Sequence, residues 1–288
     1  MKIQTFTVVA GSMACNARCP FCVAKQTPEM GVPNKEPDVN WRNFQIGIDL
    51  AKAHNVTTAL ITSKGEATLF PDQLEKFVYE LGREFPLVEL QTNALVVQRM
   101  GWAGRLRQMY EDGLTTVAIS VAHWDNEINR QIYTPHKAEY PDLASTIHIL
   151  HAIGLSVRLS VTMNKGIFDS AEDVDRMVWF AEKYKVEQLT LRPVALAGNS
   201  RQGDVRDWTE EHLLTNFQLD SIVNHVEMIG TKVMTLDHGG VVYDYGGQNL
   251  CLTDCLTINE ESDDLRQLIF FPDGALRYDW RYEGARLL

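Results

Sequence analysis

Three cysteines near the start of the chain are the residues most able to do chemistry. Cys15, Cys19 and Cys22 are separated by three and then two residues, and they follow the first strand-like segment directly. Three thiolates on one short loop can hold three irons of a cubane iron–sulfur cluster and leave the fourth iron without a protein ligand. An open iron can bind a second molecule directly. The spacing therefore predicts a redox centre on this loop.

Other uses of the cysteines are weaker. A structural zinc site needs four closed ligands, so Cys19 and Cys22 would have to join Cys251 and Cys255. That arrangement leaves Cys15 unused and gives the second pair an unusual spacing. A disulfide framework is not expected in a long chain with five cysteines and no secretory signal. Inert reduced thiols are the remaining alternative.

The elements that position this loop read as strands alternating with helices. Such alternation predicts right-handed parallel units, and six of them indicate an α/β fold, a partial (β/α)6 TIM-like barrel. The strands expected from β-branched and apolar runs are Ile3–Ala10, Thr57–Ser63, Leu87–Thr92, Thr115–Val121, Leu155–Thr162 and Val186–Arg192. The helices expected from apolar periodicity include Trp41–Ala51, Pro71–Phe85, Gly101–Asp112, Tyr140–Ile153 and Ser170–Tyr184.

The regular alternation of predicted strands and helices ends near residue 200. We expect a core barrel over residues 1–199 and a C-terminal extension over residues 200–288 that caps it. The extension reads as a helix over Trp208–Ile229, a strand at Lys232–Leu236 and a glycine-rich stretch. A hairpin follows, with strands Leu268–Phe271 and Ala275–Trp280 around a turn.

Three of the predicted strands have a polar face, although buried parallel strands usually read as continuous apolar runs. Period-two alternation gives one face of the fifth strand to Ser156, Arg158, Ser160 and Thr162, and the other to valine and leucine. The third strand and its end (Glu89, Gln91, Asn93) and the sixth strand (Gln188, Thr190, Arg192) repeat the pattern. An exposed edge strand would look the same, but three such strands together favour a polar barrel lumen.

Barrels of this kind bind substrates at the C-terminal ends of their strands. The cysteine loop follows the first strand, and Lys64-Gly65-Glu66 follows the second. Thr92-Asn93 ends the third strand, and Ser120 lies near the end of the fourth. The distinctive residues are therefore expected to meet at one end of the barrel.

The cysteine motif, with Phe21 just before its last cysteine, resembles the signature of the radical S-adenosylmethionine (SAM) enzymes. The resemblance extends over roughly Ile3 to Asn199. It implies a single 4Fe–4S cluster on Cys15, Cys19 and Cys22, with SAM chelated to the open iron. One electron, from a flavodoxin- or ferredoxin-type donor, would cleave SAM to methionine and a 5′-deoxyadenosyl radical.

Further positions carry the resemblance. Gly65-Glu66 resembles the family's Gly-Gly-Glu motif, which approaches the SAM amino group, but Lys64 replaces its first glycine. Thr92-Asn93-Ala94 looks like the family's Thr-Asn-Gly segment, and Arg158 stands where relatives carry a cation facing substrate or SAM. Ala197 falls where the backbone often contacts adenine. The implied cofactor-binding residues are Phe21, Gly65, Glu66, Asn93, Ser120, Ser160 and Ala197.

Within the family, spacing and order look most similar to the GTP cyclase of molybdenum-cofactor synthesis and its SPASM/twitch relatives. Those proteins bind an auxiliary cluster through C-terminal cysteines. Here only Cys251 and Cys255 occur in that region, and Trp280 stands about where a further ligand would be. Two cysteines cannot complete a cubane, so we expect no second cluster and two reduced thiols.

Composition narrows the class of partner. The 288 residues carry a formal net charge of −11, which argues against broad nucleic-acid binding. No apolar stretch approaches the roughly 20 residues needed to span a bilayer, and no signal peptide is evident. We therefore expect a cytoplasmic protein that does not bind membranes.

The resulting hypothesis is an enzyme that abstracts hydrogen from a small, polar, anionic molecule. Arg158, Arg192 and Lys64 would orient that substrate. A peptide-modifying maturase is the alternative, a tRNA-modifying enzyme is less favoured, and a zinc-stabilised binding protein comes from another class. Four weaker candidates are His123 for substrate contact, His238 as a lone ligand, and Tyr278 and Trp280 as covers of the barrel mouth. Asp125 is expected to cap a helix.

Overall fold

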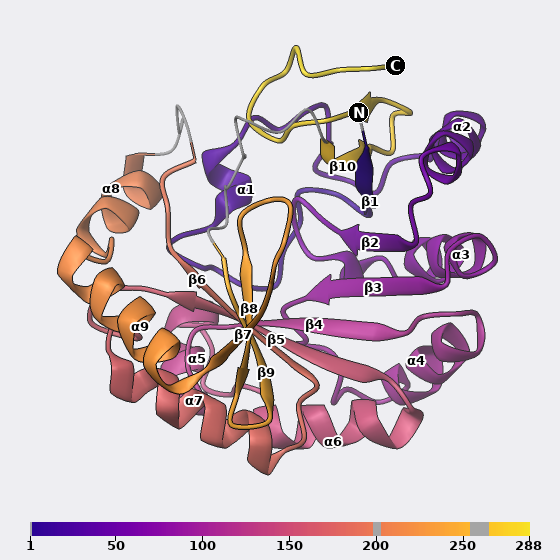
Figure 1. The fold of residues 1–288 in the computed structure, drawn as a ribbon. Coiled ribbons are helices and arrows are strands. Elements are labelled where there is room, and N and C mark those ends of the chain that lie inside the picture. The colour runs from indigo at the N-terminus through magenta and orange to yellow at the C-terminus, as the bar shows by residue number, and fades with distance from the viewer. Residues whose placement is uncertain (1, 198–202, 254–264) are drawn as a thin grey trace.

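The computed structural model describes residues 2–197, 203–253 and 265–288. Its first part repeats a strand–helix unit six times (Figure 1). The strands are β1 (Ile3–Val9), β2 (Thr58–Thr62), β3 (Leu87–Thr92), β4 (Thr116–Val121), β5 (Ser156–Met163) and β6 (Gln188–Pro193). The helices are α1 (Val23–Gln26), α2 (Trp41–Ala53), α3 (Pro71–Gly82), α4 (Trp102–Glu111), α5 (Asn126–Tyr133), α6 (Leu143–Ile153) and α7 (Ala171–Lys183), with a short 3₁₀ turn at Ala67–Leu69.

Strands β1 to β6 pair in parallel in chain order, which confirms the predicted partial barrel. Figure 1 shows helices α2, α3, α4, α6 and α7 around the outside of the strands. The core lies between these two layers. Val157, Leu159 and Val161 of β5 are fully buried in it, on the helix-facing side of their strand. The opposite side of β5, with Arg158, therefore faces the lumen, as the alternation predicts.

Local signals place the helix ends where the sequence indicates them. Ser170 and Asp173 form a capping box at the start of α7, and the Asp142 side chain caps α6. Gly154 ends α6 in the left-handed conformation, with φ of 108°. The longest helix has 14 residues, and in the described ranges no helix is both long and apolar enough to cross a bilayer.

The C-terminal extension continues the barrel sheet at both of its edges. Strand β10 (Leu265–Phe270) pairs in parallel with β1 and antiparallel with β11 (Leu276–Arg277). At the other edge, β9 (Gln248–Leu252) pairs in parallel with β6 and antiparallel with β8 (Val241–Tyr245), which pairs with β7 (Thr231–Thr235). The result is an 11-stranded sheet in the order β11-β10-β1-β2-β3-β4-β5-β6-β9-β8-β7.

Three features of the extension differ from the sequence-based expectation. The strand predicted over Ala275–Trp280 is shorter, because only Leu276 and Arg277 form β11. The single helix predicted over Trp208–Ile229 is wrong, because it is divided into α8 (Gly203–Glu211) and α9 (Asn216–Ile229). Thr215 causes the break: its hydroxyl accepts the Gln218 N–H in a capping box and starts a new helix. The glycine-rich stretch forms the β8–β9 hairpin, whose turn residues Gly246 and Gly247 both have positive φ.

Candidate active site

The cysteine loop lies between β1 and α1, and Cys22 is the residue that precedes α1. Backbone hydrogen bonds hold it from two sides. The Glu66 N–H donates to the Ala14 carbonyl at 2.9 Å, and the Arg18 N–H donates to the Tyr133 carbonyl at 2.8 Å. The loop is therefore positioned by the segment after β2 and by the end of α5.

Gly65 makes the closest approach to this loop. A Cβ atom at Gly65 would lie 2.0 Å from the Ala14 carbonyl oxygen and 2.7 Å from that of Ser12. Both are backbone atoms, so no side-chain rotation could relieve the clash. Glycine is needed here because the two backbones are in contact, a physical reason independent of any resemblance.

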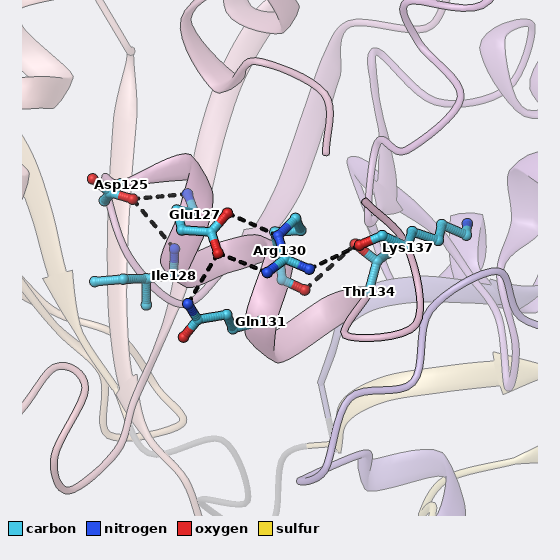
Figure 2. A network of polar contacts seen from close by, with 7 residues as sticks. All are labelled: Asp125, Glu127, Ile128, Arg130, Gln131, Thr134 and Lys137. Atoms are coloured by element: carbon cyan, nitrogen blue, oxygen red, sulfur yellow. Dashed lines mark hydrogen bonds and ion pairs between the residues drawn. The ribbon is translucent and has the colours of Figure 1, made fainter. Parts of the chain in front are cut away.

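A polar network on α5 supports the other side of the loop (Figure 2). Asp125 caps the helix as predicted, accepting the N–H groups of Glu127 and Ile128. Arg130 pairs with Glu127 and donates to the Lys137 carbonyl at 2.8 Å. The Lys137 ammonium in turn donates to the Asn16 carbonyl at 3.1 Å, inside the cysteine motif. The helix thus holds a lysine against the backbone of the loop.

The three thiols lie close enough to influence one another. Burial, with the nearby charges of Glu66 and Cys22 adding to it, raises the pKa of Cys15 to about 11. Burial, Cys22 and Cys15 likewise raise the pKa of Cys19 well above its usual value. Raised pKa values keep the Cys15 and Cys19 thiols protonated near neutral pH, and bound iron would deprotonate them. The donor set therefore fits an iron–sulfur cluster on Cys15, Cys19 and Cys22.

The zinc alternative, which requires Cys251 and Cys255 beside Cys19 and Cys22, reaches beyond the described residues. Within the described ranges, no group of three or more His, Cys, Asp or Glu side chains is arranged to hold one metal ion. Cys251 lies on β9 opposite Thr190, and burial raises its pKa against the opposing charge of Arg158. Cys255 lies outside the described residues.

Glu66 holds the ends of two strands together. One carboxylate oxygen accepts the Thr68 N–H at 3.1 Å, the Thr68 hydroxyl at 2.7 Å and the Thr92 hydroxyl at 2.6 Å. The other accepts the Asn93 N–H at 2.9 Å. Glu66 is 4% exposed, so its charge is stabilised by these four protein donors. Its predicted contact with the SAM amine would have to share an acceptor that is already largely satisfied.

Asn93 brings the end of β3 to the cysteine loop. Its side-chain amide donates to the Asn16 side-chain oxygen at 2.7 Å and lies 3.9 Å from the Cys15 sulfur. The Asn16 amide nitrogen is buried and has no hydrogen-bond partner in the described structure. An unsatisfied donor beside the three thiols indicates that a polar or anionic group completes this site.

Phe21 and Ala197 lie on the other flank of the motif. Phe21 is buried between Tyr133 and Trp208, with ring centroids 6.1 and 5.7 Å away. The Ala197 N–H donates to the Gln26 side-chain oxygen at 3.1 Å, while the Gln26 amide donates to the Phe21 carbonyl at 3.2 Å. Sequence reasoning missed Gln26. A polar residue at a buried position of α1 is the one signal that could have indicated it.

The lumen face of the sheet is polar, as predicted. Ser120 of β4, Ser160 of β5 and Thr190 of β6 are neighbours in register. Arg158 lies on the same face, which confirms its strand parity. Its guanidinium is engaged by Glu89 through two hydrogen bonds, of which the Nε contact measures 2.9 Å. Burial acts to lower the pKa of Arg158, but the charge and hydrogen bonds of Glu89 raise it overall.

The other two predicted cations have different surroundings. Arg192 is the last residue but one of β6, and among the described residues its side chain has no hydrogen bond or ion pair. Burial raises the pKa of Tyr133, and the charge of Arg192 opposes that shift. The buried Tyr133 hydroxyl also lacks a hydrogen-bond partner. The Lys64 side chain extends instead toward the end of α1. It is 4% exposed, and its ammonium donates to the Thr27 hydroxyl at 2.7 Å and the Pro28 carbonyl at 2.9 Å.

The weaker candidates fall mostly into structural positions. The His123 Nδ1 atom accepts the Asp125 N–H at 3.0 Å, which places it at the α5 cap. His238 lies in the β7–β8 loop, where burial lowers its pKa to about 4. Trp280 packs on Phe271 and faces the Lys64 ammonium, whereas Tyr278 is 43% exposed.

A partial parallel barrel with a three-thiol loop at the C-terminal end of β1 defines a class of iron–sulfur enzymes that bind a second molecule at an open iron. The model of the radical SAM superfamily matches residues 11–181, more than half of the chain. The chain belongs to the radical SAM superfamily. The family's cofactors are a 4Fe–4S cluster and SAM, and the residues described above fit both.

Solved structures of this fold include enzymes bound to peptides. The anSMEcpe structure, with bound AdoMet and a Cp18Cys peptide, matches with a TM-score of 0.63 and 12% identity, covering 97% of this chain and 74% of that one. Streptococcus suis SuiB, bound to its precursor peptide SuiA, matches with a TM-score of 0.57 and 13% identity over 96% of this chain. This chain spans 59% of the length of SuiB. No curated protein matches at a significant level.

We predict that the chain holds one cluster. After anaerobic reconstitution, iron and acid-labile sulfide should each total about four per chain. Replacing Cys15, Cys19 and Cys22 together with alanine should remove the brown absorbance, while Cys251→Ala should leave it unchanged. A count near eight that falls to four in Cys251→Ala would contradict the prediction.

The contact at Gly65 predicts a strong effect of one methyl group. Gly65→Ala should displace the cysteine loop and reduce bound iron to less than half, with little change in far-ultraviolet circular dichroism. Gly104→Ala is the matched control, because a Cβ there meets nothing within 4 Å and a helical alanine is favourable by about 0.8–1.0 kcal/mol. Equal iron content in the two variants would refute the close-contact argument.

The Glu89–Arg158 pair predicts non-additive stability effects. Arg158→Met leaves a buried carboxylate without its partner and should lower the free energy of unfolding by about 3–5 kcal/mol. The double variant Glu89→Leu/Arg158→Met should recover much of that loss, because it removes both charges. Urea unfolding of the two single variants and the double variant measures the coupling. Additive losses would show that the two side chains act independently.

Proposed function

We propose that this chain is a radical SAM enzyme that modifies a peptide. When bound, the cluster and SAM supply a radical able to take a hydrogen atom from the substrate. The chain's own contribution is to hold the thiol loop rigidly and to offer a polar lumen beside it. Two features of that lumen and its surroundings support a peptide over a small anion.

The observation that carries this proposal is the neutralised charge of the lumen. The hypothesis of a small anionic substrate relies on Arg158, Arg192 and Lys64, and Glu89 already pairs with the Arg158 guanidinium. The adjoining lumen residues Ser120, Ser160 and Thr190 are neutral hydrogen-bonding groups. Such a surface suits the amides and uncharged side chains of a peptide better than it suits a phosphate.

The edge of the sheet provides a second support. Strand β7 is the last strand in the sheet order, and all five of its residues are exposed. An edge strand offers unpaired backbone N–H and C=O groups, with which an extended peptide can form a further strand. Met228, Val233 and Met234 add exposed apolar side chains at this edge. Both SuiB and anSMEcpe, whose folds match nearly all of this chain, have peptides in their structures.

One observation favours the small-anion alternative. Arg192 and the Tyr133 hydroxyl lie on the same side of the barrel, and within the described residues neither has a hydrogen-bond partner. A carboxylate or phosphate could bind there. The SAM carboxylate would satisfy the same two groups, so this pair does not require an anionic substrate.

Hydrogen transfer distinguishes the two substrate classes. Reconstituted enzyme, SAM and dithionite would be incubated without oxygen, either with deuterated synthetic peptides, the Cp18Cys and SuiA peptides among them, or with deuterated GTP. We expect deuterium in 5′-deoxyadenosine from a peptide and none from GTP, measured by mass spectrometry. Cys19→Ala enzyme is the control and should form no 5′-deoxyadenosine.

Two outcomes would overturn the proposal. Deuterium transfer from GTP and from no peptide would establish the small-anion alternative. Colourless protein that purifies with zinc and cleaves no SAM would indicate the non-catalytic binding protein instead.

A further inference from the structure

We propose that Lys64 is the counter-charge of the iron–sulfur cluster and makes its one-electron reduction easier. This inference rests on the cluster assigned under the proposed function, but not on the identity of the substrate. Lys64 stands where the family motif has glycine, so the motif itself does not supply this cation.

Lys64 is a buried cation held in one place. Its side chain crosses from the segment after β2 to the end of α1, where the Thr27 hydroxyl and the Pro28 carbonyl accept its hydrogen bonds. The ammonium also lies 5.4 Å from the centre of the Trp280 ring. Thr27 is itself 8% exposed and donates its hydroxyl hydrogen to the Val23 carbonyl. These contacts orient the ammonium without neutralising it.

No acidic side chain among the described residues balances the charge of Lys64. In the part of the chain that the structure describes, no carboxylate forms an ion pair with Lys64. Burial lowers its pKa to about 8, against the opposing influence of Cys22 and of the exposed Glu29. A buried charge is costly unless an opposite charge compensates for it. Cys22, a predicted cluster ligand, raises the pKa of Lys64 more than Glu29 does.

A cluster on the cysteine loop supplies the missing negative charge. Three thiolates outweigh the positive charge of the iron–sulfide core, so the oxidised cluster is anionic and reduction adds one more negative charge. The electron comes from an external reductant, and no proton transfer is required. A fixed cation therefore stabilises the reduced state more than the oxidised state, which raises the reduction potential.

Lys25 provides a matched control for the charge. Lys25 lies in α1, and its charge acts to lower the pKa of Cys19. It is exposed, whereas Lys64 is buried. Water and salt screen an exposed ammonium much more than a buried one. Removing either lysine changes the net charge equally, so a difference between them isolates the effect of burial.

The test is a redox titration of reconstituted protein followed by electron paramagnetic resonance. Wild type, Lys64→Met, Lys64→Arg and Lys25→Met would be compared without substrate, each with and without SAM. In Lys64→Met we expect the ratio of reduced to oxidised cluster at a fixed potential to fall about tenfold, a shift of about 59 mV for one electron. Lys25→Met should shift by much less, and Lys64→Arg should recover most of the wild-type potential.

The outcomes separate this inference from the proposed function. An unchanged potential in Lys64→Met with a full cluster would overturn the counter-charge role alone. A shift seen only with SAM present would also overturn it, because the charge would then act on the SAM carboxylate. If Lys64→Met fails to hold iron, Lys64→Gln, which keeps a donor toward Thr27 and Pro28, takes its place in the titration. Failure of wild type to hold a cluster would contradict the proposed function itself.

Discussion

The contact between the backbone of Gly65 and the carbonyl of Ala14 is the constraint on which the candidate site depends. It joins the segment after β2 to the cysteine loop after β1, and the Glu66 N–H adds a hydrogen bond to the same carbonyl. The Glu66 carboxylate then connects this segment to Thr92 and Asn93 at the end of β3. Three successive strand ends are thereby held together, which a thiol loop needs if its sulfurs are to keep a fixed arrangement.

Charge in this protein is partitioned between two regions. In the lumen, Arg158 is compensated by Glu89, so the surface beside the site is polar but close to neutral there. Near α1, Lys64 keeps its charge because its acceptors are a hydroxyl and a carbonyl. The partition has a physical consequence: Arg158 is paired within the protein, while the thiol loop has a buried cation nearby. It also explains why counting cations at strand ends says little about substrate charge.

Much of the fold could be predicted from the sequence, because the signals for it are local. Each of the six barrel strands begins and ends within about two residues of its β-branched run, and helix α7 begins at a capping box visible as Ser170 followed by Asp173. Cysteine spacing indicated the loop, and period-two alternation indicated the lumen side of Arg158. The division between α8 and α9 was missed because apolar periodicity continues across the Thr215 cap.

By itself, then, the sequence determined the order of elements, the thiol loop and the faces of the strands. Only the tertiary structure decided which groups those faces bring together. Arg158 meets Glu89 across 69 residues of chain because β3 and β5 lie on either side of β4, where Ala118 is the register partner of Arg158. Lys64 meets Thr27 because the loop after β2 packs against the segment that follows β1 and ends α1. Such partners depend on register and side-chain volume in neighbouring strands, and no local pattern encodes either of them.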